Sequence, residues 1–389
     1  MKVKKLLILT LAVMLLPAVT SLFAADADDH YTQGNTYFDQ KQYPEALTEY
    51  QKAVETDPSN KDAYFRIGNV YIKLKKYANG AEAFKKFLDL VPAKGQDAAD
   101  GLYNLGLCYD YMGETDLAID NYNKSMEIDA THADVFDRIG LIYENKQDYV
   151  KAQTYYLRAT EVEPNNKNGF INMGYVSKEQ EKYQDAIDWF NKAIAIDPQN
   201  TESIIEKGNC YDKLGDLETA FATYAKAADI DPTDKEAQYN MGYIEIKKKE
   251  YDKAAPYFQG ILKSDPVYKK AHYELGYIHE LKKEYDDAIK EYKKEIDVNP
   301  NYAESYNTLG LVYMDDKNDL NTSLKMFKQA VEVDPQYYYS WDNMGLVYEK
   351  MGDNDKAMEN YNKALAIKPD FKTALDDKAA LQEKLKSSK

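Results

Sequence analysis

Apolar and polar residues follow one another along this chain in a pattern that returns every 34 residues. In one copy, apolar residues recur at helical spacing over 170–176 and over 186–194, and a polar run, 178–182, separates the two blocks. Two such blocks with a short polar gap predict a pair of antiparallel helices. The second helix should end at Asp197-Pro198, because the residue before a proline disfavours helical geometry.

Ten copies of this unit follow one another, and three marker residues define each copy. A glycine comes first: Gly34, Gly68, Gly106, Gly140, Gly174, Gly208, Gly242, Gly276, Gly310 and Gly345. Twelve residues later, or thirteen in the ninth copy, comes a second small residue: Ala46, Gly80, Ala118, Ala152, Ala186, Ala220, Ala254, Ala288, Ser323 and Ala357. Four residues further on comes an aromatic ring: Tyr50, Phe84, Tyr122, Tyr156, Phe190, Tyr224, Phe258, Tyr292, Phe327 and Tyr361. Small residues let two helices approach closely while the ring fills the space beside them, and neighbouring pairs must stack to bury their apolar faces.

The sixth copy shows these three markers with three further residues, in the order Gly208, Tyr211, Ala220, Tyr224, Ala227 and Pro232. This set and its spacing resemble the tetratricopeptide repeat family. In the register of that family, copies one and two occupy 27–94, and copies three to ten occupy 99–371. The resemblance implies an all-α fold, an α-α superhelix or solenoid of helix pairs. Its first helices would line a concave groove that typically holds a peptide or a partner protein.

Two places break the period. Residues 95–98 are a four-residue insertion, which we interpret as a longer turn, with a hinge as the alternative, because loop insertions cost little. The ninth copy has one extra residue within DDKNDLN. Its aspartates suggest calcium, but no glycine stands at the sharp turn and Met326 stands where a bidentate glutamate is needed, so this signal is weak.

The tail, 372–389, fits one more first helix through Leu375 and Ala379, and then departs from the pattern. No second helix follows it. An array needs a polar terminal helix over the exposed face of its last repeat. We therefore predict that this segment is a C-terminal capping helix.

The N-terminal 24 residues have a basic start, an apolar core over 6–19 and small residues up to Ala24 and Ala25. This order is typical of a secretory signal peptide. The alternative is a membrane anchor, but the apolar core is shorter than the ~20 residues of a spanning helix, and Pro17 interrupts it. We predict export to the periplasm or, second, full secretion, with no integral membrane span after cleavage.

Charge and cysteine content narrow the choice of partner. The chain has 50 Lys and Arg against 66 Asp and Glu, a net charge of −16, which argues against nucleic acid and against anionic membranes. Cys108 and Cys210 stand where the other copies have aliphatic residues. We therefore predict two buried thiols and no disulfide between them.

The repeats leave little room for catalysis. No glycine-rich phosphate loop, CxxC, HExxH or nucleophile motif is present. His272 and His279 lie seven residues apart, a spacing that fits core histidines better than metal ligands. We predict a protein that is not an enzyme and that uses no metal and no cofactor.

Groove-lining positions, which the resemblance places at 2, 5, 6, 9, 12 and 13 of each copy, are acidic, with nineteen acidic and eight basic residues. The charge is concentrated in copies four to six, at Asp134, Asp137, Glu202 and Glu206 among others. Such a groove favours a basic or amphipathic protein or peptide segment. The alternative is that these acids only keep the array soluble.

Copies seven and eight have tyrosines at positions 5 and 9, namely Tyr239, Tyr243, Tyr273 and Tyr277. Residues four apart share one helix face, so we predict a patch of four tyrosines for partner binding, with packing as the alternative. Asn209 and Asn240 are predicted to hydrogen-bond the main chain of the guest. The tyrosines would also suit a glycan or another envelope polymer.

The family's clamp for terminal carboxylates is only partly present. Asn69, Asn104 and Arg138 match three of its positions, but Phe65 and Asp134 replace both lysines, which makes carboxylate capture doubtful. The sequence therefore predicts an exported scaffold that binds proteins. A further alternative is an envelope assembly factor that oligomerises through the ends of its array.

Overall fold

The computed structural model describes residues 26–387, and within this range every regular element is a helix, with no strand. The chain divides into two compact units, the first ending at Pro198 and the second beginning at Gln199. The predicted signal peptide, 1–24, lies outside the described residues. No helix in the described range is both long enough and apolar enough to cross a membrane.

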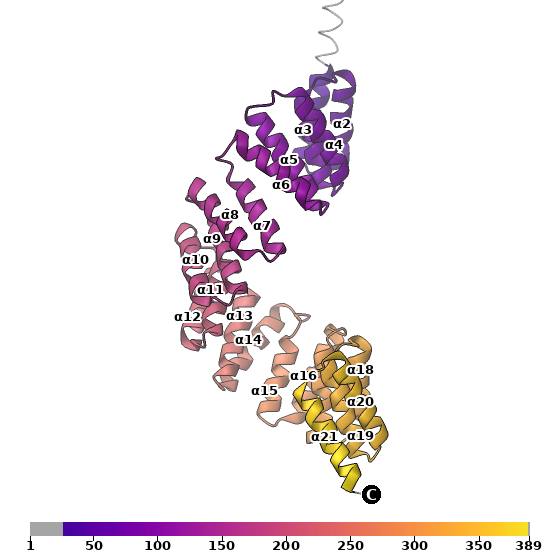
Figure 1. Cartoon of the computed structure of the whole chain (residues 1–389). Helices are drawn as coiled ribbons and strands as arrows, with labels where there is room; N and C mark the ends of the chain where they lie inside the picture. Colours follow the sequence, from indigo (N-terminus) through magenta and orange to yellow (C-terminus); the bar gives the residue numbers. More distant parts are fainter. Residues whose placement is uncertain (1–25, 388–389) are drawn as a thin grey trace, which may run out of the picture. The chain divides into compact units, whose positions relative to one another are not determined.

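The first unit consists of five helix pairs (Figure 1). The helix over 26–39 pairs with α2 (Tyr43–Thr56), α3 (Lys61–Lys73) with α4 (Tyr77–Leu90), α5 (Gln96–Tyr111) with α6 (Thr115–Ile128), α7 (Ala133–Asn145) with α8 (Tyr149–Val162), and α9 (Lys167–Glu179) with α10 (Tyr183–Ile196). From α2 onward in this unit, successive helices contact each other both within pairs and between them.

The second unit continues the series with five more pairs and a final helix. The pairs are α11 (Thr201–Lys213) with α12 (Leu217–Ile230), α13 (Lys235–Lys247) with α14 (Tyr251–Ser264), α15 (Ala271–Leu281) with α16 (Tyr285–Val298), α17 (Ala303–Leu311) with α18 (Leu320–Val333), and α19 (Tyr338–Lys350) with α20 (Asn354–Ile367). The last helix is α21 (Lys372–Ser387). These pairs confirm the predicted all-α solenoid of paired helices.

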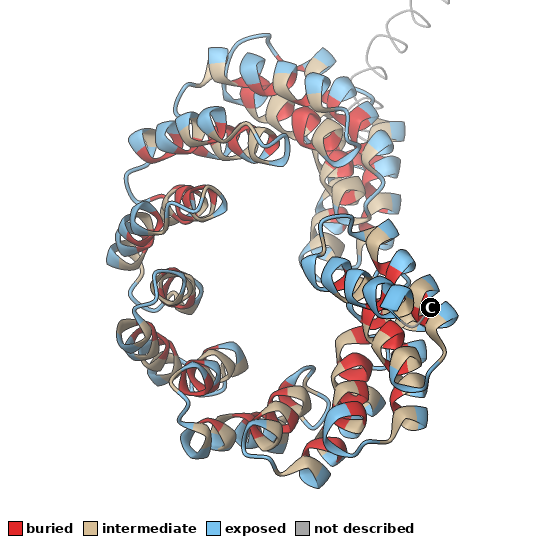
Figure 2. Ribbon diagram, turned by 60° about the horizontal axis from the view of Figure 1, so that its bottom comes forward, coloured by how far each residue is buried: buried red, intermediate tan, exposed pale blue. Residues whose placement is uncertain are grey.

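Each pair is held together by a ring packed onto a glycine. In the second unit, a Cβ added at Gly208 would lie 2.6 Å from the Tyr224 ring, and one added at Gly345 would lie 2.4 Å from the Tyr361 ring. The same contact recurs in all ten copies, and the rings are almost completely buried. Figure 2 shows this buried seam in red between paired helices, with exposed residues on their outer sides. The glycines are therefore required for space.

The insertion at 95–98 differs from the predicted turn or hinge. Only Gly95, with φ of 127°, precedes the helix, and residues 96–98 form the first turn of α5. As a result α5 has 16 residues, whereas α7 has 13. The insertion thus adds three residues to the helix and one to the turn before it.

The extra residue of the ninth copy is taken up by η1 (Val312–Asp316), a π-helical turn that continues α17. The wider turn is closed by the bond from the Lys317 N–H to the Val312 carbonyl, 3.1 Å. Asp319 then accepts a hydrogen bond from the Thr322 N–H, 3.0 Å, at the start of α18. This aspartate of the DDKNDLN segment thus serves as a helix cap.

Helix α21 covers the last pair. Ala374 and Leu381 are fully buried, and Leu381 packs in one cluster with Ala357 and Tyr361. Leu375, in contrast, is 44% exposed. The repeat register aligns Leu375 with residues that contact the second helix of their own pair. This side chain stays uncovered because no such helix follows within the described residues.

Both cysteines are fully buried, which confirms their predicted place in the core. Burial raises the pKa of the Cys108 thiol to about 12. A thiol with such a pKa stays protonated and unreactive at neutral pH.

Candidate functional site

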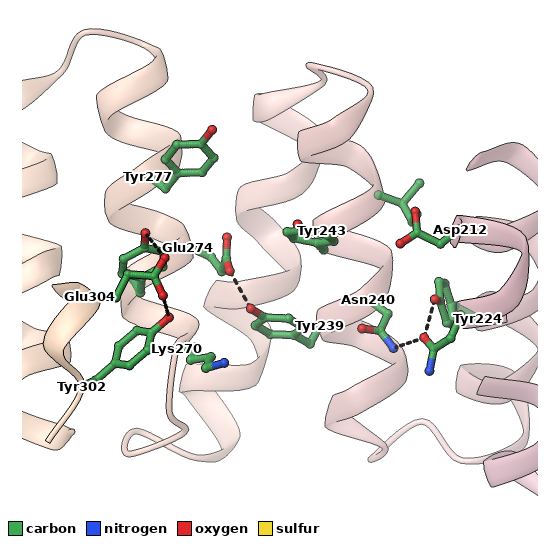
Figure 3. Close-up of a pocket in the computed structure, with 13 residues that line it drawn as sticks. Asp212, Tyr224, Tyr239, Asn240, Tyr243, Lys270, Glu274, Tyr277, Tyr302 and Glu304 are labelled. Carbon is green, nitrogen blue, oxygen red and sulfur yellow. Dashed lines mark hydrogen bonds between the residues drawn. The ribbon is translucent and has the colours of Figure 1, made fainter. Parts of the chain in front are cut away.

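A groove of about 560 Å³ lies within the second unit, between the first helices of successive pairs (Figure 3). Six of the ten residues predicted to bind a partner line it: Asn209, Tyr239, Asn240, Tyr243, Tyr273 and Tyr277. They come from three helices, α11, α13 and α15. Their meeting in one place follows from the repeat, since residues 34 apart occupy equivalent positions in adjacent pairs. Their role in binding stays a prediction.

The four tyrosines of the predicted patch differ in exposure. The Tyr239 ring packs edge-on against Phe258, with ring centres 5.4 Å apart, and the Tyr273 ring packs against Tyr292 at 5.5 Å. Tyr243 is 39% exposed. Tyr239 and Tyr273, at repeat position 5, thus pack against the second helices of their pairs, as the alternative to partner binding predicted. Their hydroxyl groups also reach the groove.

Two carboxylates that were not among the ten residues predicted to bind a partner lie among these rings. Glu274 is only 6% exposed and accepts a 2.5 Å hydrogen bond from the Tyr239 hydroxyl. Glu304 accepts hydrogen bonds from the hydroxyls of Tyr302 and Tyr273. Figure 3 shows Tyr239 pointing to Glu274 and Tyr302 pointing to Glu304. The groove therefore presents acids held by tyrosine hydroxyls.

Burial raises the pKa of Glu274, and the negative charge of Glu304 acts in the same direction. The hydrogen bond from Tyr239 and the charge of Lys270 oppose this rise in pKa. Among the described residues, however, no cation comes within 4.0 Å of either carboxylate. The Lys270 amino group instead lies 5.4 Å from the centre of the Tyr302 ring.

The backbone of Lys270 is fixed by a hydrogen bond to a buried glutamate. It precedes α15 in a left-handed conformation, φ 71°, and its N–H donates to the Glu295 carboxylate at 2.8 Å. Glu295 is fully buried and also accepts from the Tyr273 N–H at 3.4 Å. This carboxylate caps the start of α15 and so fixes the directions of Tyr273 and Glu274.

The two asparagines are already engaged in part. The Asn209 oxygen accepts a 2.7 Å bond from the Tyr224 hydroxyl and a 3.5 Å bond from the Asn240 amide. Tyr224 belongs to α12 and is almost fully buried. The side chains that would meet the guest's main chain are thus positioned by the core ring of the sixth repeat.

The four predicted acidic residues do not line this groove. Asp134 and Asp137 lie on α7 of the first unit, whereas Glu202 and Glu206 lie on α11 of the second. Asp134, unlike Asp137, is exposed. Asp137 accepts a 2.9 Å hydrogen bond from Asn166, and burial raises its pKa to about 6.

The two histidines considered as ligands bind glutamates of their own repeat. His272 lies 2.7 Å from Glu291, and His279 lies 2.7 Å from Glu284. In the part of the chain that the structure describes, no group of three or more His, Cys, Asp or Glu side chains is arranged to hold a metal ion.

Comparisons with known proteins agree with this architecture. Family models described as tetratricopeptide repeat match residues 61–94, 99–132, 138–201, 178–241, 239–305, 303–337 and 339–371, and one described as TPR repeat matches 34–75. Among curated proteins, Hsp70-Hsp90 organizing protein 2 of Arabidopsis thaliana is 25% identical over 112 residues, which is 29% of this chain and 19% of that protein.

Two solved structures show a similar fold. The C-terminal part of a TPR repeat-containing protein from Cytophaga hutchinsonii is 21% identical, with a TM-score of 0.52, over 62% of this chain and 97% of the other. Yeast Tom70 is 13% identical, with a TM-score of 0.54, over 93% and 96%. At these identities the likeness concerns the fold alone. Together with the ten glycine-ring pairs, the family matches show that this chain belongs to the tetratricopeptide repeat family.

Proposed function

We propose that this protein is an exported, non-enzymatic scaffold that binds a basic or amphipathic segment of a partner protein in the groove of its second unit. Tetratricopeptide repeats bind protein and peptide partners, and six of the ten residues predicted to bind a partner line this groove. The observation that carries the proposal is the joint presence in this groove of tyrosines, asparagines and two carboxylates that have no cation within 4.0 Å among the described residues.

The chemistry of the groove suits a peptide. Tyrosine supplies apolar area and a hydroxyl group at little cost in conformational entropy. The asparagine amides can bond a main chain, and the carboxylates complement basic side chains. A basic guest also agrees with the acidic charge of the whole chain.

A glycan ligand has less support from the geometry. Sugar rings stack on open aromatic faces, but Tyr239 and Tyr273 use part of their ring surface against Phe258 and Tyr292. Salt separates the two ligand classes: binding of a basic peptide weakens steeply as ionic strength rises, whereas binding of a neutral glycan does not.

Export rests on residues 1–24. Mass spectrometry of the protein recovered from an envelope fraction should give a chain that starts after Ala24 or Ala25. A chain that retains Met1 would contradict export by a cleaved signal.

Site-specific photo-crosslinking tests the groove itself. A crosslinking amino acid at Tyr243 should give a defined adduct in envelope extracts, and the added change Tyr277→Ala should reduce it at least fivefold. The matched control is the same crosslinker at Tyr111, a 44% exposed tyrosine of the first unit. Equal adducts from both positions, or no effect of Tyr277→Ala in a folded protein, would place the binding site elsewhere.

Sedimentation of the same samples tests the alternative role as an assembly factor. That role requires oligomers whose size grows with protein concentration.

A further inference from the structure

We infer that one positively charged side chain anchors the guest, a lysine or arginine that inserts beside Glu274 and Glu304 among Tyr239, Tyr273 and Tyr302. This inference rests on the proposed function, because it names the part of the partner segment that the same groove selects. It goes further in committing to one cation at one place.

The charge of the groove favours a cation at this place. Glu274 is only 6% exposed, and its carboxylate accepts a hydrogen bond from Tyr239. A buried carboxylate without a counter-charge is costly, and a second carboxylate nearby adds to the cost. Lys270 lowers this cost without forming an ion pair. A cation from the guest would compensate both acids at once, which gives the guest a reason to enter at this point.

The rings around the two acids favour the same occupant. The hydroxyls of Tyr239, Tyr273 and Tyr302 all donate hydrogen bonds to the two carboxylates. These bonds orient the carboxylate oxygens, and the three tyrosine rings surround the place proposed for the cation. A cation near aromatic rings gains further electrostatic attraction. Lys270 already shows this preference, since its amino group lies over the Tyr302 ring. Acids and rings together therefore favour a cation over an apolar side chain.

The first unit contains a cation at the matching place. Glu274 follows Tyr239 by 35 residues, and Arg138 follows Tyr103 by the same 35, so the two pairs occupy equivalent repeat positions. The Arg138 guanidinium lies 5.7 Å from the centre of the Tyr111 ring, and Tyr103, Tyr111 and Tyr122 act to raise its pKa against the effect of burial. The fold thus seats a cation among tyrosines at this register when the chain supplies one. In the second unit a guest would supply it.

Peptide titration tests the anchor. The probes are blocked heptapeptides of Ser, Gly and Leu with one central residue, which is lysine, arginine, norleucine or glutamate. Binding to the mature chain is followed by NMR of the tyrosine rings. Lysine and arginine peptides should bind at least tenfold more tightly than the norleucine peptide, and the glutamate peptide should bind least.

Two variants keep the test specific. Glu274→Gln and Glu304→Gln preserve shape and should each reduce the preference for lysine over norleucine to less than threefold, with folding checked by circular dichroism. Glu332→Gln removes the same charge from an exposed position of α18 outside the groove and should leave the preference unchanged.

The outcomes separate the two proposals. Equal binding of lysine and norleucine peptides overturns the anchor but leaves a peptide groove. If Glu332→Gln acts as strongly as Glu274→Gln, general charge explains the effect and the anchor is overturned. If no lysine or arginine peptide binds at low millimolar concentration, the anchor is overturned, and the adduct at Tyr243 then decides whether the groove binds any protein.

Discussion

Arg138 in the first unit and Glu274 in the second stand at equivalent repeat positions, yet their surroundings differ. Arg138 lies over the Tyr111 ring, so the tyrosine cluster of the first unit contains its own cation. Glu274 accepts a bond from Tyr239 and has a second carboxylate, Glu304, in its electrostatic range. The same repeat position thus holds a cation beside tyrosine rings in the first unit and a buried carboxylate beside them in the second.

This comparison shows how a repeat protein divides its tasks. The glycine and the core ring set the geometry and recur in every copy. The residues at positions 5 and 6 vary in charge, and in the proposed function this charge determines whether the groove needs a cation from a guest. Three kinds of change test this comparison: added volume, exchanged charge and altered pH. They ask whether the repeats around Arg138 and Glu274 share the same packing and differ only in charge.

The largest effect should come from added volume beneath the two clusters. In Gly106→Ala a new Cβ would lie 2.8 Å from the Tyr122 ring, and in Gly276→Ala it would lie 2.7 Å from the Tyr292 ring. Both rings are fully buried, so each variant should lose about 2 to 3 kcal/mol of unfolding free energy, measured by urea denaturation. Gly260→Ala is the control, because its Cβ would meet nothing within 4 Å. A loss in only one variant would show that the scaffolds differ.

Exchanging the charges should affect stability less than the added volume does. It should lower stability in the first unit and peptide binding in the second. Burial raises the pKa of Asp110, and the charge of Arg138 opposes this rise. Arg138→Glu replaces that charge by a second carboxylate and should destabilise the first unit by about 1 to 2 kcal/mol. Glu274→Arg replaces the buried carboxylate of the groove by a second cation, in addition to Lys270. It should leave the protein folded and weaken binding of the lysine peptide at least tenfold, as measured by NMR titration. Unchanged binding by folded Glu274→Arg would mean that the groove does not select charge.

The smallest effect should be a dependence of stability on pH. Asp137 in the first unit and Asp342 in the second share repeat position 5, and each has one buried oxygen without a hydrogen bond. Burial raises the pKa of Asp137 to about 6, and burial with the charge of Asp377 raises the pKa of Asp342 to about 7. Both exceed the ordinary aspartate pKa of about 3.9, so the folded state holds the proton more tightly than the unfolded state.

These pKa values determine the direction of the pH dependence. The stabilising contribution is fully present below about pH 4 and is lost as pH rises, through about 6 in the first unit and about 7 in the second. The groups that face Asp137 are Asn166, Asp134, Glu163 and Arg138. Hydrogen exchange in α7 and α19 should slow by an amount equivalent to about 1 kcal/mol between pH 8 and pH 5, after correction for intrinsic rates. Asp137→Asn and Asp342→Asn should each remove the effect in their own unit only.

Much of the fold could be predicted because its determinants are local and repeated. The glycine, the second small residue and the ring stand at fixed spacing in one pair, so each copy confirms the next. The insertion was harder to interpret. Its four residues carry no apolar marker, and the sequence did not show that Gln96 and Asp97 would extend α5 backward.

The site could be predicted only in part. Tyr239, Tyr243, Tyr273 and Tyr277 follow from periodicity, but the packing of two of these rings depends on Phe258 and Tyr292 of the second helices. Three further residues that line the groove lie near the boundaries between copies. Lys270 depends on a left-handed backbone that no pattern marks, and Tyr302 and Glu304 come from the junction with the ninth copy.

The π-helical turn of the ninth repeat shows how the repeat accommodates an added residue. A single added residue turns everything beyond it by about 100° around a helix axis, which would misplace every later contact. Here the wide turn at Val312–Asp316 takes up the addition, and Gly310 still meets the Phe327 ring, which would lie 2.6 Å from a Cβ added at that glycine. The ninth copy thus tolerates an added residue without losing its register, because the wide turn confines the addition to the end of its first helix.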